Sequence, residues 1–374
     1  MLSYWEKSSL TEYDLIVIGG GITGLFCALE FRKKNPSATI AVFERGLFPN
    51  GASTKNAGFA CFGSLTELIE DDANMGSDAL LSLVEKRIQG LDKLRTTLGD
   101  TSLDYKQNGG YELFSNDKIP DTSQIEKFNT LLRPIFKKTV YSIDKGAVNR
   151  FGFSAKHIKT VIKNPFEGQI NTGSMMAGLL EEVRKNNIVL FNNTKVLDIE
   201  INSLDNRLSV NHQSSVLQFK SRYLAICNNG FAGQFLPDLD SNPGRGLVVL
   251  TEPIKGLKVK GCFHYNEGYY YFRNIHNRIL FGGGRELDLK GETTTDHGIN
   301  PKIKKQLLQD LNAFILPETT PKIEMEWSGI MAFGKTKLPI VKKINHNAVM
   351  GVRLGGMGVA IGSLIGKETC DLFR

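Results

Sequence analysis

Three glycines and one acidic residue near the start of the sequence have the spacing of a phosphate-binding turn. Gly19, Gly21 and Gly24 follow an apolar run. In such a turn the first glycine permits a tight bend, the second lets the backbone approach a pyrophosphate, and the third allows close helix packing. Glu44 lies about 20 residues past the last glycine, where a carboxylate can accept hydrogen bonds from ribose hydroxyls. These residues predict a dinucleotide site; the alternative is an ordinary glycine turn in an α/β unit.

The elements that must position this turn lie within residues 13–45. Residues 15–18 are a continuous apolar run, and residues 39–43 are a second β-rich run that ends just before Glu44. Between them the glycine turn opens a helix whose first N–H groups would point at the phosphates. The order of strand, turn, helix and strand supports the nucleotide interpretation more than the glycine spacing alone.

Length and composition indicate a soluble protein of more than one domain. A chain of 374 residues is long for one hydrophobic core, so two domains are expected. Its 41% hydrophobic and 23% charged residues are typical of soluble globular proteins. The net charge of +7 is scattered, without a run of basic residues, which argues against a nucleic-acid partner. The surplus could attract anionic groups, or it could be a solvated basic surface.

The cysteines and the N-terminus indicate where the protein acts. The five cysteines are widely spaced and form no C-x-x-C pair, which favours a reducing compartment over a disulfide framework. The first residues lack the pattern of a signal peptide, and no stretch of about eighteen apolar residues follows. We therefore expect a cytoplasmic protein without a transmembrane segment. The six histidines form no metal-binding cluster, so no metal site is expected.

A loop of small and polar residues follows the first β-α-β unit, at residues 47–64. Small side chains let backbone amides approach a flat ligand. Ser53, Thr54, Lys55 and Asn56 offer hydrogen-bond donors along it. This pattern indicates a ligand-facing loop; the alternative is a flexible surface loop.

The rest of the chain alternates between two kinds of pattern. Residues 65–98 have helical spacing of apolar residues, residues 172–201 suggest a helix and two strands, and residues 354–372 suggest a glycine-opened apolar helix. Residues 105–114 and 240–325 have short β-rich runs with turns between them, which predict an antiparallel sheet. The predicted fold is α/β (α+β overall).

Six segments, taken in order, resemble the glycine oxidase, sarcosine oxidase and D-amino-acid oxidase family of flavoproteins. They read YDLIVIGGGITGL, GASTKNAGF, EGQINTGSMMAGLLEEV, KVLDIE, WSGIMAFGKTKLPIV and GVRLGGMGVAIG. The resemblance spans most of the chain and implies FAD as the cofactor. It also implies a Rossmann-like FAD-binding domain with an inserted antiparallel-sheet substrate domain. The first would comprise residues 1–85, 150–233 and 322–374, and the second residues 86–149 and 234–321.

The resemblance also implies roles for individual residues. The turn glycines would hold the pyrophosphate, Glu44 the ribose, residues 53–58 the flavin ring, and residues 195–196 the adenine. The helix start at residues 355–358 would face the flavin pyrimidine, unless it is only a tight packing contact. The full set of expected cofactor residues is Gly19, Gly21, Ile22, Thr23, Gly24, Glu44, Arg45, Ala52, Ser53, Thr54, Lys55, Asn56, Ala57, Gly58, Phe59, Lys195, Val196, Asn229, Gly230, Leu354, Gly355, Gly356, Met357, Gly358 and Val359.

The sequence departs from the family pattern in two places. Many amino-acid oxidases of the family have an arginine shortly after a Trp-x-Gly position, where it clamps the substrate carboxylate. Here residues 327–329 are followed by Ile330, Met331 and Ala332. The missing arginine weakens the case for an α-amino-acid substrate, and the pattern is closer to the γ-glutamylputrescine oxidoreductase-like branch. Members with covalent flavin use a cysteine in this late segment, and residues 327–343 contain none, so noncovalent FAD is expected.

Candidate substrate groups come from the antiparallel sheet. Tyr271, Arg273 and Arg285 could orient an amine or a carboxylate, although each could be an ordinary sheet or surface residue. No residue is an obvious general base. Hydride transfer from a C–H beside a neutral amine needs positioning and desolvation more than a base.

These observations predict an FAD-dependent amine or amino-acid oxidase or dehydrogenase. The amine would donate hydride to flavin N5, and the imine would hydrolyse to a carbonyl product. Oxygen or an electron carrier would reoxidise the flavin. Two alternatives stay open: an FAD-dependent 2-hydroxy-acid dehydrogenase on the same scaffold, and a catalytically inactive flavin-binding module.

Overall fold

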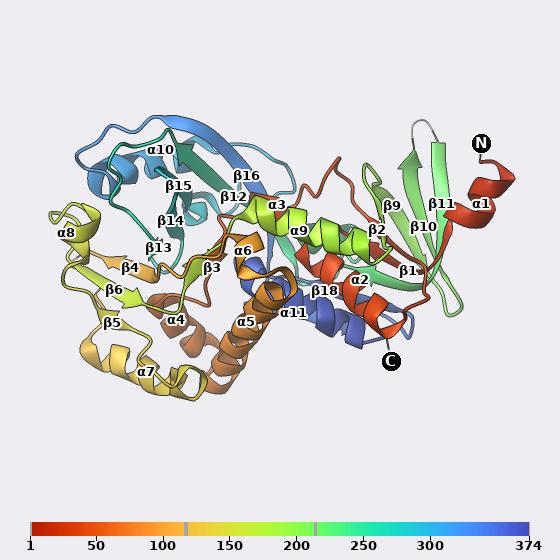
Figure 1. Cartoon of the computed structure of the whole chain (residues 1–374), viewed down its shortest axis with the longest axis horizontal. Helices are drawn as coiled ribbons and strands as arrows, with labels where there is room; N and C mark the ends of the chain where they lie inside the picture. Colours follow the sequence, from red (N-terminus) through yellow and green to blue (C-terminus); the bar gives the residue numbers. More distant parts are fainter. Residues whose placement is uncertain (1, 116–118, 213–214, 374) are drawn as a thin grey trace.

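The computed structural model describes residues 2–115, 119–212 and 215–373. Two large sheets lie toward opposite ends of the long axis of the molecule (Figure 1). The chain passes between them several times, so each sheet contains segments far apart in sequence. This arrangement leaves room for a site between the two sheets.

The first sheet contains the predicted β-α-β unit. Its inner strands pair in parallel, and residues 15–18, 40–43, 224–226 and 348–352 within them are buried, as expected for the part of a sheet that is covered on both faces. An antiparallel ribbon extends it through β9 (Val196–Ile201) and β10 (Asn206–His212). The main strand order is β17 (Ile340–Lys343), β18 (Ala348–Val352), β11 (Ser215–Ile226), β1 (Glu12–Ile18), β2 (Ile40–Phe43) and β8 (Val189–Phe191).

Two helices pack tightly on this sheet because glycines remove the side chains between them. Helix α2 (Ile22–Lys34) contacts α11 (Gly358–Asp371), where a Cβ on Gly366 would lie only 2.5 Å from Thr23 O. Helix α5 (Ser77–Leu98) packs on the other side of α11 through Gly90. Helix α9 (Thr172–Lys185) also packs against α2. Helix α11 is therefore held in place by neighbours on two sides.

The second sheet is mostly antiparallel. One face buries a cluster of aromatic rings, including Phe263, Phe272 and Phe281, beneath α8 (Ala147–Phe151) and α10 (Pro301–Asp310). The other face is turned toward the first sheet. The strand order is β16 (Ile323–Phe333), β12 (Asn242–Thr251), β15 (Arg278–Gly283), β14 (Tyr270–Ile275), β13 (Cys262–Tyr265), β4 (Gly110–Phe114), β6 (Thr160–Asn164) and β5 (Ser142–Ile143).

Shorter elements precede, connect or follow the strands of the two sheets. A second apolar cluster joins α5 and two shorter helices, α4 (Leu65–Met75) and α7 (Thr122–Phe136), to β4 and β6. No helix in the described part of the chain is long and apolar enough to span a membrane. The shorter elements are α1 (Tyr4–Leu10), α3 (Ala52–Lys55), α4 (Leu65–Met75), α6 (Asp100–Leu103), α7 (Thr122–Phe136), β3 (Phe59–Ala60), β7 (Gly168–Gln169), the 3-10 turns η2 (Asn229–Gln234) and η3 (Arg285–Asp288), and the π turn η4 (Leu311–Ile315).

The predicted fold class is confirmed by the mixed α/β architecture and these two sheets. The domain limits stay a proposal. Residue 85 falls inside α5, and β6 and β16 pair within the second sheet although they lie in segments assigned to the FAD-binding domain. A division by sheet pairing would therefore move these two strands to the substrate domain.

Candidate active site

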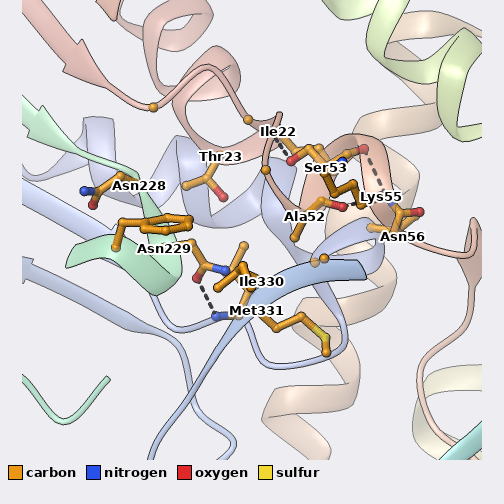
Figure 2. Close-up of a pocket in the computed structure, with 18 of the residues that line it drawn as sticks. Ile22, Thr23, Ala52, Ser53, Lys55, Asn56, Asn228, Asn229, Ile330 and Met331 are labelled. Carbon is orange, nitrogen blue, oxygen red and sulfur yellow. Dashed lines mark hydrogen bonds between the residues drawn. The ribbon is translucent and has the colours of Figure 1, made fainter. Parts of the chain in front are cut away.

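A cavity lies where the carboxyl ends of the parallel strands face the second sheet (Figure 2). Ile18 at the end of β1, Phe43 at the end of β2 and Cys227 just after β11 all line it. Ligands of open α/β sheets bind at this edge, because the loops and helix N-termini that follow the strands converge there.

The glycine turn forms one wall of the cavity. Gly19 has φ +112°, and a Cβ there would lie 2.7 Å from Cys227 O, so no other residue fits without a backbone shift. A Cβ on Gly24 would overlap Gly19 O. Helix α2 begins beyond Gly21, which provides no side-chain cap. Its first N–H groups are therefore available, apart from that of Ile22, which donates to Ser53 Oγ at 3.0 Å (Figure 2).

Glu44 lies at the end of β2 and is fixed by the backbone. Its Oε2 accepts a hydrogen bond from Gly20 N at 3.2 Å, and its Oε1 accepts one from Gly46 N at 2.9 Å. The carboxylate is buried and lines the cavity. Each oxygen has a further lone pair, so the group can still accept hydrogen bonds from a ribose.

Two buried polar atoms on this wall lack a partner among the described residues. Thr23 Oγ1 and Asn228 Oδ1 make no hydrogen bond, and both residues line the cavity (Figure 2). Buried polar groups in native proteins are almost always satisfied, so such atoms indicate a missing ligand. Figure 2 shows Asn228 and helix α3, which carries Lys55, on opposite sides of the cavity.

A second helix N-terminus faces the cavity at the start of α11. Met357 precedes the helix without a side-chain cap, and a Cβ on Gly355 or Gly356 would meet nothing within 4 Å. Asn229 Oδ1 accepts hydrogen bonds from Arg353 N at 3.0 Å and Leu354 N at 3.3 Å, which fixes the preceding turn. The free N–H groups can stabilise negative charge. Together with the glycine turn, this arrangement fits an elongated dinucleotide such as FAD.

Most of the predicted cofactor residues line this cavity. Gly24, Thr54 and Gly230 do not. Gly24 packs against the backbone of Gly19, and Gly230 packs against Met331 O. Thr54 Oγ1 donates to Pro49 O at 2.8 Å, so its hydroxyl is used within its own loop. These three residues shape the cavity wall from behind.

The register of the second sheet decides which side chains face the cavity from the other side. His264 pairs with Tyr271, Tyr271 with Gly282, and Gly282 with Val248. Directly paired residues point to the same face. His264, Tyr271 and Val248 line the cavity, and the Tyr271 ring lies over Gly282, which has no side chain to block it. Burial raises the pKa of the Tyr271 phenol to about 12, so it remains a hydrogen-bond donor at neutral pH.

The two predicted arginines do not reach the cavity. Arg273 shares the face of Tyr271, but it is buried and donates from Nη1 to Gly58 O at 3.2 Å. Arg285 places its guanidinium 4.0 Å from the centre of the Phe333 ring. Neither residue lines the cavity, because the first is covered by the loop at Gly58 and the second is held against β16. Of the three predicted substrate residues, only Tyr271 lies at the cavity.

Sequence reasoning missed several residues that line the cavity, above all Glu67 and His264. Glu67 is the third residue of α4, and its Oε2 accepts a hydrogen bond from Ser64 N at 2.9 Å. The Ser-x-x-Glu spacing of this capping box was a usable signal for the helix start. His264 is a single residue in a strand, and nothing in its local sequence indicates which face it occupies.

Buried carboxyl groups lie behind this end of the cavity. Burial raises the pKa of Glu112 to about 7 and that of Glu167 to about 8. Glu112 accepts hydrogen bonds from Thr66 N at 3.2 Å and from the Thr66 hydroxyl. Glu167 accepts weaker ones from Phe62 N at 3.3 Å and Gly63 N at 3.4 Å. Within the described ranges, no group of His, Cys, Asp and Glu is suited to hold a metal ion.

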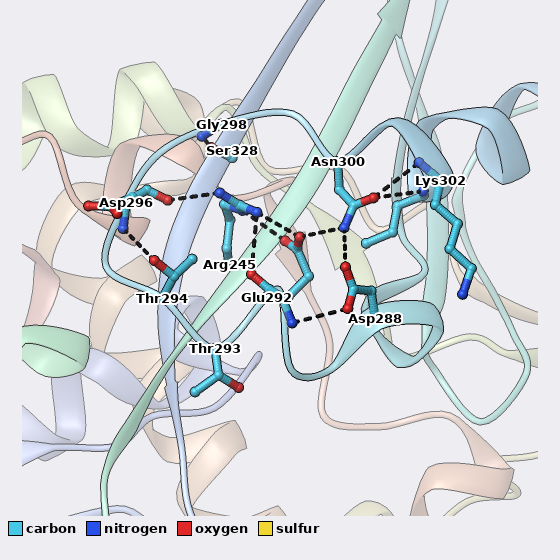
Figure 3. Close-up of polar contacts among 12 residues, drawn as sticks. Arg245, Asp288, Glu292, Thr293, Thr294, Asp296, Gly298, Asn300, Lys302 and Ser328 are labelled. Atoms are coloured by element: carbon cyan, nitrogen blue, oxygen red, sulfur yellow. Dashed lines mark hydrogen bonds and ion pairs between the residues drawn. The ribbon is translucent and has the colours of Figure 1, made fainter.

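A network of charged and polar side chains holds the long loop between η3 and α10 (Figure 3). Arg245 on β12 pairs with the buried Glu292 through Nε at 2.9 Å and Nη2 at 2.8 Å. Asn300 Nδ2 donates to the same carboxylate at 2.9 Å. Gly298 N donates to Ser328 Oγ at 3.0 Å, which ties the loop to β16. The loop is therefore fixed to the second sheet rather than to the first.

Comparison with known proteins gives the family. The family described as FAD dependent oxidoreductase matches residues 14–372, whereas no curated protein matches the chain. Glycine oxidase from Geobacillus kaustophilus has a similar structure, with 20% identity, a TM-score of 0.74, and coverage of 97% of this chain and 95% of that chain. L-proline dehydrogenase from P. horikoshii is also similar, with 16% identity, a TM-score of 0.76, and coverage of 97% of this chain and 93% of that chain. Iminodiacetate oxidase from Chelativorans sp. BNC1 has 16% identity, a TM-score of 0.72, and coverage of 94% of this chain and 93% of that chain.

At these identities the solved structures share the fold with this chain, while the family match covers almost its whole length. The expected family, the expected enzyme class and FAD as the cofactor are confirmed by that match. The glycine turn, Glu44 and the two helix N-termini are the features of this chain that fit the cofactor. The chain is an FAD-dependent oxidoreductase and belongs to the family of that name.

Proposed function

We propose that the protein oxidises the C–N bond of an amine or amino acid, and that the resulting imine hydrolyses to a carbonyl compound. The observation that carries this proposal is the composition of the cavity wall opposite the glycine turn. Tyr271, His264, Phe59 and Val248 make that wall largely aromatic and apolar. In the described chain the one arginine that lines the cavity is Arg45, which follows Glu44 at the nucleotide end.

Bound FAD supplies a hydride acceptor for such a reaction. The residues of the chain contribute orientation and desolvation. Phe59 packs edge-on against both His264 and Tyr271, with ring centres 5.1 and 5.7 Å apart. These rings exclude water from the reacting carbon, and the Tyr271 hydroxyl can donate a hydrogen bond that fixes the substrate. A neutral amine nitrogen beside the C–H bond would provide the electrons that favour hydride departure.

The proposal is tested by anaerobic mixing of the purified holoenzyme with matched substrates. Primary amines, secondary amines, N-methyl amino acids, D-amino acids and 2-hydroxy acids are compared by loss of flavin absorbance. We expect amines to bleach the flavin, and hydroxy acids of the same carbon skeleton to leave it oxidised. Bleaching by hydroxy acids alone would support a 2-hydroxy-acid dehydrogenase. A flavin that stays oxidised with every compound would support an inactive flavin-binding module.

Three finer proposals accompany this one. We propose that the FAD is noncovalent, so acid precipitation should leave the yellow flavin in the supernatant. The electron acceptor is oxygen or a carrier; mixing the reduced enzyme with air and with an artificial carrier dye would distinguish them by reoxidation rate.

We also propose a cytoplasmic location, which fits the five free, buried cysteines. The closer likeness to γ-glutamylputrescine oxidoreductases stays a prediction.

A further inference from the structure

Glu67 presents a carboxylate at the substrate end of the cavity. It lies in the first turn of α4, it lines the cavity, and one of its oxygens is held by Ser64 N. The hairpin between β13 and β14 covers it at Gly268, which has φ +79°; a Cβ there would lie 2.6 Å from Glu67 Oε1. The side chain is therefore confined between a helix start and a hairpin.

The position of α4 places Glu67 beside the row of substrate-facing residues. Glu112 pairs with His264 in the sheet, so both side chains point to the cavity face. Thr66 binds the Glu112 carboxyl through its amide and its hydroxyl, which fixes the first turn of α4 on that face. Glu67, the next residue, then lies close enough to His264 to affect its protonation. His264 is 6% exposed, and its Nε2 has no partner in the described chain.

Glu67 forms no ion pair with a described residue, although Lys337 lies near enough to interact with its charge. The nearby lysine, Lys337, instead pairs with Glu70 at 2.8 Å and Asp71 at 2.7 Å. Burial lowers the pKa of His264, so its imidazole is neutral at pH 7 and can accept a hydrogen bond. Glu67 therefore offers a carboxylate without an ion-pair partner, beside an unpaired imidazole nitrogen.

We propose that Glu67 anchors a cationic nitrogen of the substrate that is distinct from the nitrogen whose C–N bond is oxidised. The substrate class is then an amine that carries a second ammonium or guanidinium group. The distinction follows from the chemistry, since hydride leaves a carbon beside a neutral amine, whereas a carboxylate binds the charged form. This inference rests on the proposed amine oxidation and specifies its substrate.

The test compares short α,ω-diamines with 1-aminoalkanes and ω-amino acids of the same length. Anaerobic reduction gives a rate and an apparent Kd for each, and perturbation of the oxidised flavin spectrum gives a Kd without turnover. We expect the wild-type holoenzyme to bind the diamine about tenfold or more tightly than the monoamine. Glu67→Gln should remove that preference and leave the Kd of the monoamine within about threefold. Glu67→Lys should make the ω-amino acid the preferred compound.

Glu70→Gln is the matched control. It also removes one carboxylate charge, one turn further along α4, but Glu70 already pairs with Lys337. It should keep the preference for diamines. Flavin content and circular dichroism confirm that each variant is folded. Equal diamine preference in wild type and Glu67→Gln would overturn the inference, as would a diamine that neither perturbs nor reduces the flavin. If monoamines still reduce the flavin, the proposed amine oxidation stands even when the inference on Glu67 fails. If no amine reduces the flavin, the proposed amine oxidation itself is contradicted.

Discussion

The two ends of the cavity are built in different ways. On the side proposed for the cofactor, the chain offers backbone groups from short continuous segments, namely the turn at residues 19–24 toward the nucleotide and the helix start at residues 354–358 toward the flavin. At the substrate end it uses side chains from strands that are neighbours only through sheet register, such as His264 and Tyr271. Backbone recognition depends on a glycine at a fixed spacing. Side-chain recognition depends on pairing across the sheet.

This difference explains why a cofactor can be held constant while substrates change. Gly19 and Gly24 cannot be replaced without moving the backbone. A cavity-facing residue on the second sheet can be exchanged without disturbing any ladder hydrogen bond. We therefore expect mutations at the nucleotide end to abolish the holoenzyme, and mutations at the substrate end to alter specificity or local stability.

The largest effect should come from Gly24→Ala. The new methyl group would overlap Gly19 O, and backbone cannot yield as a side chain can. We expect FAD affinity to fall by at least about a hundredfold, measured as flavin content and by titration of the apoprotein. Gly233→Ala is the control, because Gly233 is exposed and a Cβ there meets nothing within 4 Å. Wild-type flavin content in Gly24→Ala would contradict the role given to the turn.

A large loss of stability, with FAD retained, should follow from Glu292→Ala. This change leaves Arg245 without its partner in a largely buried pair, which costs about 3–5 kcal/mol of unfolding free energy. Denaturant unfolding of the holoenzyme measures it. Glu324→Ala breaks the more exposed pair with Arg278 on the same sheet and should cost about 1 kcal/mol or less. Equal costs for the two variants would show that the loop network in Figure 3 is not a structural anchor.

The buried carboxyls should make stability depend on pH. The folded-state pKa of Glu167 is raised from 4.5 to about 8, so the folded chain keeps a proton that the unfolded chain loses. The resulting stability is fully present below about pH 4.5 and is lost as the pH rises to about 8. We expect the unfolding free energy of Glu167→Gln to fall less than that of wild type between about pH 5.5 and pH 8.5. Parallel curves for the two proteins would count against this assignment.

The smallest effects concern the groups first considered for substrate binding. Tyr271→Phe removes one hydrogen-bond donor and should weaken substrate binding by about 3- to 10-fold, in line with about 1 kcal/mol for a neutral hydrogen bond. Arg285→Gln should change the reduction rate by less than about twofold, because its guanidinium stacks on Phe333 outside the cavity. Stopped-flow reduction with a good amine substrate measures both. A tenfold loss in Arg285→Gln would restore it as a substrate residue.

Sequence reasoning predicted the nucleotide end because its determinants are consecutive residues. The spacing of Gly19, Gly21 and Glu44 predicts a backbone arrangement that forms within one β-α-β unit, without contacts from distant segments. The substrate end was predicted only in part. Alternation along β14 places Tyr271 and Arg273 on one face, but whether each reaches the cavity depends on what covers that face. The loop at Gly58 covers Arg273, and no local pattern could indicate this contact.

The same limit applies to the groups that sequence reasoning missed. Glu67 reads as an ordinary helix-capping acid, and only the docking of Thr66 onto Glu112 directs it to the cavity. The local sequence marks His264 only as a strand residue, and its pairing with Tyr271 places it on the cavity face of the sheet. Both positions result from contacts between segments that are far apart in sequence. Such contacts follow from the packed fold and not from any single segment.

One measurement tests the central claim most directly: the products of a single anaerobic turnover with a primary amine. If the cavity oxidises a C–N bond, each flavin reduced should yield one carbonyl compound and one ammonia after hydrolysis of the imine. Reduced flavin without release of ammonia, or reduction by the matched hydroxy acid in place of the amine, would contradict the account.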